Sequence, residues 1–187
     1  MLRERQSRPK RPTTSLLTTG VVQEIPIFSD GICADILVRA IQAVQHSHGF
    51  EVLAYVIMPA HFRWIVHLGR GRWTVSDVMR DLKGQSALEI MAYLEKEHSY
   101  GALSVFFRSA KDLGDQRRRF WRPHFEQTVI GDLETLRSRI EAMHEEPVRA
   151  GLAAHPAEYR YSSARSHLLG EQSVIPITPI SALEWIA

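Results

Sequence analysis

The stretch "YVIMPAHFRW" (residues 55–64) decides the fold, because it reads as two β-strands joined by a tight connection. Apolar and β-branched residues lead up to Pro59, and the alternation of polar and apolar residues resumes at His61. Proline has no N–H to donate to a sheet ladder, so it ends one strand rather than continuing it. A connection this short predicts an antiparallel hairpin formed by residues 50–58 and 61–68.

The sequence on either side of this hairpin predicts the other elements of a small α+β fold. Apolar spacing, capping residues and prolines set the expected boundaries. In order, we expect a strand over residues 15–28, a helix over 34–49, the hairpin, a long helix over 74–98, an irregular stretch over 100–119, a strand over 120–130 and a helix over 132–147. The order βαββαβ predicts a ferredoxin-like sandwich, an antiparallel sheet with helices on one face, to which a C-terminal helix and tail are added.

Length and composition fit one compact domain with ragged ends. The chain has 187 residues, 44% of them hydrophobic, which is enough to bury a core. Cys33, the single cysteine, excludes an intramolecular disulfide and fits a reducing compartment. No apolar run approaches the ~18 residues that span a bilayer, and residues 1–15 lack the apolar stretch of a secretory signal. We therefore expect a cytoplasmic protein with no membrane partner.

Two stretches are basic although the formal net charge is only +2. The first eleven residues hold five basic side chains and one acidic side chain. The stretch "DQRRRFWRPHF" (residues 115–125) sets Arg117, Arg118, Arg119 and Arg122 around Phe120 and Trp121. Arginine pairs with phosphate and aromatic rings stack on exposed bases, so this interleaving suits a nucleic acid. The alternative is a disordered tail and a solvated loop whose aromatic rings turn into the core.

The second strand of the hairpin presents two polar side chains together. Positions two apart in a strand point to the same side, so His61 and Arg63 share a face with His67. A histidine at position 63 would complete a pair able to bind a divalent cation. Arginine stays protonated, so it repels a metal and itself binds phosphate. His67 lies about 20 Å further along the strand, too far to share a metal with His61.

Five short motifs together resemble the REP-associated tyrosine transposases of the HUH single-strand transposase superfamily. "VLAYVIMPAHFRWIVHL" (52–68) is similar to that family's hairpin, which reads Met-Pro-Asn-His-hydrophobic-His. "VSDVMRDLKGQSALEI" (75–90) contains its Met-x-x-x-Lys element, which ends here at Lys83. The other three motifs are "FWRPHFEQTVI" (120–130), "EEPVRAGL" (145–152) and "HPAEYRYSSA" (155–164). They follow in the family's order, and the resemblance covers residues 15–167.

The resemblance implies single-strand DNA chemistry by a homodimer that binds single-stranded or hairpin DNA. In that family a tyrosine attacks the phosphodiester, and Mg or Mn held by two histidines polarises the phosphate. His61 matches the first metal histidine, but Arg63 stands at the second. Aligning "AMHEEPVRAG" puts Ala142 at the position of the nucleophilic tyrosine and Glu146 at that of a polar asparagine. No catalytic residue can therefore be assigned, and the only candidate metal ligands are His61 and Glu146.

The main hypothesis is a DNA-binding protein of the tyrosine transposase family, related to DNA transposition by descent, whose catalytic site is degenerate. Its predicted parts are a basic flexible tail (1–14), a transposase-like domain (15–167) and a C-terminal extension (168–187). The predicted DNA-binding residues are Arg63, Lys83, Arg117, Arg118, Arg119, Trp121 and Arg122.

Several alternatives stay open. The chain could be an active metal-dependent transposase that nicks and joins single strands with a noncanonical site. It could also be a domesticated protein-interaction module that has lost DNA binding. For Glu146 the alternative to a metal ligand is one half of a solvated glutamate pair at a helix end, and the five tyrosines have packing as their alternative to nucleophilic attack.

Overall fold

The structure is a computed structural model that describes residues 12–111 and 119–182. Its sheet has four strands in the order β2-β3-β1-β4, and every neighbouring pair is antiparallel. Along the chain the elements are β1 (Thr13–Gly20), α1 (Gly31–His48), β2 (Glu51–Ile57), β3 (His61–Leu68), α2 (Val75–Lys96), α3 (Tyr100–Lys111), β4 (Glu126–Ile130), α4 (Leu133–His144), α5 (Glu146–Arg149) and α6 (Ala164–Leu169). Short 3-10 turns lie at Val22–Glu24, Ile27–Ser29, Pro156–Glu158 and Ile180–Ala182. The predicted ferredoxin-like sandwich is confirmed.

The hairpin forms as predicted and sets which side chain faces which layer. The backbone N–H of Met58 donates to the carbonyl of His61 at 2.8 Å and closes the connection. Along β3, Phe62 and Trp64 are fully buried in the core beneath α1 and α2, whereas Ile65 is buried in a second core on the opposite face. The period of two therefore places the other side chains of the Ile65 face, including His61, away from α1 and α2.

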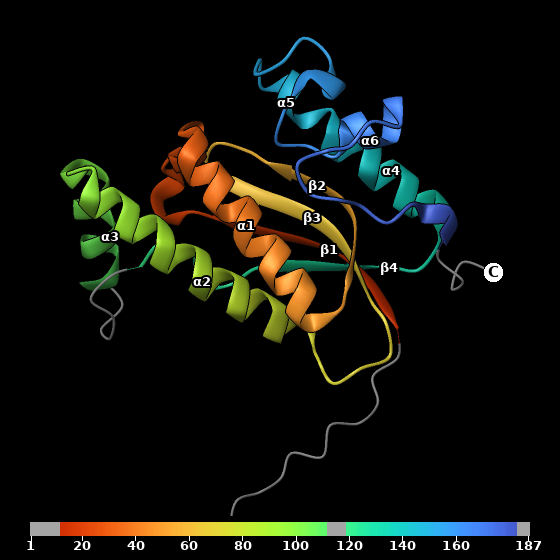
Figure 1. The fold of residues 1–187 in the computed structure, drawn as a ribbon, viewed down its shortest axis with the longest axis horizontal. Helices are drawn as coiled ribbons and strands as arrows, with labels where there is room; N and C mark the ends of the chain where they lie inside the picture. The colour runs from red at the N-terminus through yellow and green to blue at the C-terminus, as the bar shows by residue number, and fades with distance from the viewer. Residues whose placement is uncertain (1–11, 112–118, 183–187) are drawn as a thin grey trace, which may run out of the picture.

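The sheet has helices on both of its faces (Figure 1). Helices α1 and α2 cross one face, and α4 packs over the other through Leu136, Ile140 and Met143. The helices predicted to cover one face of the sheet are thus α1 and α2. The predicted additional C-terminal helix is α4, which covers the other face. Helix α1 begins where the Asp30 side chain accepts from the N–H of Ile32 at 2.8 Å, which satisfies a donor that the helix itself cannot.

Two predicted boundaries around the first and fourth strands are wrong. Strand β1 ends at Gly20 instead of continuing to residue 28, because the chain turns there into two 3-10 segments with Gln23 at a positive φ. Strand β4 begins at Glu126 rather than at residue 120. Before it, Trp121 makes only an isolated bridge with Val21, and the proline that follows two residues later cannot extend a ladder.

The stretch predicted to be irregular holds a helix, α3. Its buried residues Leu103, Phe106 and Ser109 recur every three positions, so one face packs on the core while Phe107 stays partly exposed. The pattern is short, and Ser99 just before it and Gly101 in its first turn favour a loop on local propensity alone. Packing against α2 and the Val22–Glu24 turn provides the stability that the local sequence lacks.

The C-terminal extension packs along the free edge of β2. The N–H of Thr178 donates to the carbonyl of Val52 at 2.8 Å, and ahead of the extension the N–H of Ile57 donates to the carbonyl of Tyr161 at 2.9 Å. Residues 168–182 are therefore integrated with the domain. At the other end, β1 already begins at Thr13, one residue before the predicted end of the tail at residue 14. Within the described ranges, no helix combines the length and apolarity that crossing a membrane requires.

Candidate functional site

A cleft of about 670 Å³ opens at the end of the sheet where β1 ends and β3 begins. Gly20 and His61 are partners in the β1–β3 register, which brings both strand ends to this point. The segment 122–126, which leads into β4, forms one wall, and Glu146 at the start of α5 lies across from it. We call this the sheet-end cleft; His61 and Arg63, which were predicted to share one face of their strand, both line it.

His61, Arg63 and Glu146 form one ion-paired cluster in the sheet-end cleft. The Glu146 carboxylate is hydrogen-bonded to His61 through Oε1 (2.6 Å to Nε2) and accepts from Arg63 through Oε2 (3.0 Å to a terminal guanidinium nitrogen). The Glu146 side chain is only 18% exposed and that of Arg63 27%. Burial acts to raise the pKa of Glu146, but the hydrogen bonds and charges of His61 and Arg63 outweigh burial and hold that pKa below its usual value.

This donor set does not fit a divalent metal. The structure brings the two candidate ligands together, but His61 and Glu146 bond to each other, and the second carboxylate oxygen is held by a permanent cation, Arg63. In residues 12–111 and 119–182, no group of three or more histidine, cysteine or carboxylate side chains could hold a metal ion. Mg and Mn bind through several oxygen ligands, and a guanidinium beside the site opposes them.

The position that matches the family's nucleophilic tyrosine also has no reactive side chain. Ala142 is exposed on α4, and its carbonyl accepts a hydrogen bond from Arg149 at 2.8 Å. None of the five tyrosines of the chain, all of which the structure describes, lines the sheet-end cleft. Tyr55 is buried, Tyr93 donates to Asp30, Tyr100 is exposed beside His98, Tyr159 donates to the carbonyl of Ile57, and Tyr161 donates to Asp35.

The charge of the sheet-end cleft does not favour a phosphate. Three carboxylates line it, those of Glu24, Glu126 and Glu146, against two guanidiniums, those of Arg63 and Arg122. Both guanidiniums are already ion-paired: that of Arg63 with Glu146 at 3.0 Å, and that of Arg122 with Glu24 at 2.6 Å. No sequence pattern pointed to Glu24, which reaches the cleft through the positive-φ turn after β1.

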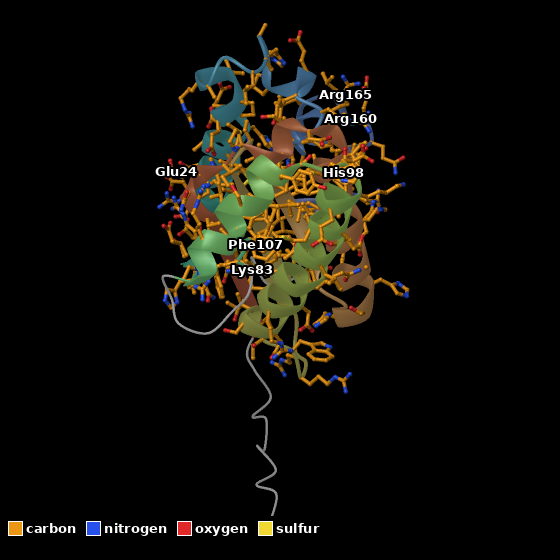
Figure 2. All side chains as sticks on the ribbon, turned by 90° about the vertical axis from the view of Figure 1, so that its left-hand side faces the viewer. Glu24, Lys83, His98, Phe107, Arg160 and Arg165 are labelled. Atoms are coloured by element: carbon orange, nitrogen blue, oxygen red, sulfur yellow. The ribbon has the colours of Figure 1, made fainter. Side chains whose placement is uncertain are left out.

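A second concavity, of about 380 Å³, adjoins the sheet-end cleft, since Arg122 and Pro123 line both. We call it the cationic groove; it lies between α2 and the segment 119–123, and Figure 2 labels Lys83 on that side. Lys83 donates to the backbone carbonyl of Arg122 at 2.6 Å. Burial, together with the charge of Arg119, lowers the pKa of Lys83 to about 8.

The cationic groove contains no carboxylate among the described residues that line it. The Nε of Arg119 is buried and has no hydrogen-bond partner in the described part of the chain. Lys83 and Arg119 thus lie near each other, and no described carboxylate lies in the groove with them. The repulsion between the two charges is unfavourable, and a bound anion would relieve it.

The remaining predicted DNA-binding residues divide into two groups. Trp121 is a correction: it is 5% exposed, packs against Phe28 and Phe120, and its indole N–H donates to Ser86 Oγ at 3.1 Å, so neither ring face is open to a base. Its burial agrees with the alternative stated for this stretch, in which the aromatic rings turn into the core. Arg117 and Arg118, like the basic residues of the first eleven positions, lie outside the described residues.

Comparison with known proteins gives a likeness in fold. No family model and no curated protein matches the chain. Among solved structures, a REP-associated tyrosine transposase bound to a REP hairpin matches with a TM-score of 0.61 and 17% identity, over 98% of this chain and 96% of that one. A candidate transposase from Deinococcus radiodurans R1 matches with a TM-score of 0.46 and 19% identity, over 76% of this chain and 94% of that one. The first likeness shows that the chain has a transposase fold; the second is too distant to add to it.

Proposed function

We propose that this chain is a DNA-binding protein of the tyrosine transposase family that retains a DNA-binding surface and has lost cleavage. The proposal extends to this chain the single-stranded or hairpin DNA that the sequence motifs imply, and a solved neighbour of the same fold carries a hairpin. Fold alone does not fix function, so the proposal depends on the two concavities described above.

The cationic groove is the observation that carries the binding half of the proposal. Half-buried Lys83 and Arg119 line this concavity, and none of the described residues that line it is a carboxylate. A phosphate placed there would neutralise the charges of both cations, which makes DNA a suitable ligand. Lys83 is also the last residue of the family-like Met-x-x-x-Lys element.

The sheet-end cleft supports the loss of cleavage. Arg63 occupies the place of a metal histidine, and its guanidinium pairs with Glu146 instead of leaving room for a cation. Ala142 offers no nucleophile, and none of the five tyrosines, all of them described, lines the cleft. We infer that Arg63 and Glu146 are complementary replacements, in which an internal cation and anion stabilise a position that once held a metal. A cytoplasmic homodimer is part of the same proposal.

The experiment is a titration of labelled hairpin DNA with a single-stranded flank, repeated over a range of salt. We expect salt-dependent binding, and we expect the substitution pair Lys83→Met and Arg119→Met to flatten the dependence of log K on log salt. Each lost phosphate contact changes the slope by roughly 0.7 for a single strand and 0.9 for duplex, so the pair changes it by about 1.4 to 1.8. Methionine keeps the apolar packing of both stems and removes only the charge.

The matched control is Arg39→Ala with Arg137→Ala, which removes the same charge from exposed positions on α1 and α4. These helices cover opposite faces of the sheet, so the two residues do not form one continuous surface. We expect the control to change the slope by less than about 0.5, as expected for general charge alone. Absence of salt-dependent binding, or equal slopes for the two pairs, would remove the proposal.

A further inference from the structure

The loop between β3 and α2, "GRGRW" (residues 69–73), forms a basic surface at the opposite end of the sheet from His61. Arg70 and Arg72 are exposed and alternate with the exposed Gly69 and Gly71. Leu68 lies seven residue steps after His61 in β3, a distance of about 23 Å along the strand. This loop is therefore not part of the sheet-end cleft.

The two arginines of this loop have no carboxylate partner in the described part of the chain. Other exposed arginines do: Arg80 pairs with Asp77 and Asp81, and Arg122 pairs with Glu24. Arg70 and Arg72 form no ion pair with any described side chain. The loop therefore presents two positive charges that no described side chain neutralises.

The loop is anchored rather than freely suspended. The guanidinium of Arg72 lies 4.3 Å from the centre of the Trp73 ring, in cation–π contact. Trp73 in turn packs on His48 at 4.3 Å between ring centres, and His48 is hydrogen-bonded to Asp81 of α2 at 3.0 Å. Thr74 then caps α2 by accepting from the N–H of Asp77. This chain of contacts limits the entropy that Arg72 would lose on binding a ligand.

A second basic stretch joins the fold at the same place. Thr13, the first residue of β1, is the register partner of Leu68, the last residue of β3, and both strand ends lie beside the loop in Figure 1. The first eleven residues, with five basic side chains and one acidic side chain, are attached within two residues of Thr13.

We propose that the Arg70–Arg72 loop is a second contact surface for the phosphate backbone of the DNA bound in the cationic groove, and this rests on the proposed function. Lys83 lies nine residue steps after Thr74, the cap of α2, which is about 14 Å along the helix and corresponds to about four base-pair steps of 3.4 Å. Guanidiniums alternating with glycines contact phosphates without reading bases, so the loop adds affinity and no sequence preference.

The test uses a double variant that carries both Arg70→Ala and Arg72→Ala. It is compared with the control double variant, Arg39→Ala with Arg137→Ala. Hairpins of one sequence carry stems shortened one base pair at a time, and the salt slope is measured for each. On the longest stem the loop pair is expected to flatten the slope by about 1.8. After shortening by about four base pairs this difference is expected to vanish, while the effect of Lys83→Met and Arg119→Met persists.

The possible outcomes separate this inference from the proposed function. If the DNA does not bind at all, or the Lys83 and Arg119 substitutions change nothing, the proposed function fails and this inference fails with it. If those substitutions act as expected but the loop pair matches the control on every stem, only the loop inference is overturned. Circular dichroism and urea unfolding of the loop variant check that it folds, and both mutated side chains are exposed.

Discussion

Changing Glu146 to glutamine tests whether the sheet-end cluster is a structural ion pair. The change leaves Arg63 beside a neutral amide, at a position where its side chain is 27% exposed. Breaking a buried pair costs ~3–5 kcal/mol and exposed pairs contribute ~0.2–1 kcal/mol, so partial burial places this pair between the two ranges. We expect Glu146→Gln to lower the free energy of unfolding by about 1.5 kcal/mol.

The measurement is a double-mutant cycle by urea unfolding, with Arg63→Met, Glu146→Gln and the double variant. We expect a coupling energy of about 1.5 kcal/mol with an unchanged m-value. The control is the pair Arg165 and Glu171, whose side chains also approach within 2.9 Å but are 48% and 55% exposed. Its coupling should stay below about 0.5 kcal/mol. Equal couplings for the two pairs would refute the reasoning that burial makes the Glu146 cluster structural.

Three further predictions follow from buried and missing groups. Burial and the charge of a neighbouring histidine lower the pKa of His144 to about 3, so its stabilising neutral form is fully effective above about pH 6.5. We expect the protein to lose about 2 kcal/mol of stability from this group between pH 7.5 and pH 5, and the His144→Gln variant to lose less, in urea unfolding. Trp121→Phe removes the hydrogen bond to Ser86 and should cost about 1 kcal/mol of stability. It should leave the hairpin dissociation constant unchanged, and a tenfold loss of affinity would show that the ring contacts DNA. Neither Ala142→Tyr nor Arg63→His alone should give a protein-linked DNA band on a denaturing gel with Mn, because nucleophile and metal act together. A band from either single variant would contradict this.

The sheet and its long helices could be predicted because their signals are local and periodic. Alternation through residues 61–68, helical spacing before Gly49 and capping at Thr74 each have one favoured structure. Helix α3 could not be predicted, because its stability comes from packing against α2. The same holds for the end of β1, where tertiary contacts support an unfavourable positive φ at Gln23.

The candidate site could be predicted only in part. The face shared by His61 and Arg63 follows from strand geometry, and the approach of Glu146 depended on a family resemblance. Sequence placed Trp121 among DNA contacts because basic and aromatic residues alternate there, but the pattern cannot tell a stacking ring from a buried one. The cationic groove needed the structure, since Lys83 and Arg119 are far apart in sequence and meet through the α2 contact.

The most direct test of the account is one incubation of the unaltered protein with labelled hairpin DNA and Mn, divided between a native gel and a denaturing gel. The account predicts a shifted complex on the native gel that weakens with salt, and only free DNA of full length on the denaturing gel. A protein-linked or shortened DNA band on the denaturing gel would contradict the loss of cleavage. Absence of any shift at low salt would contradict DNA binding itself.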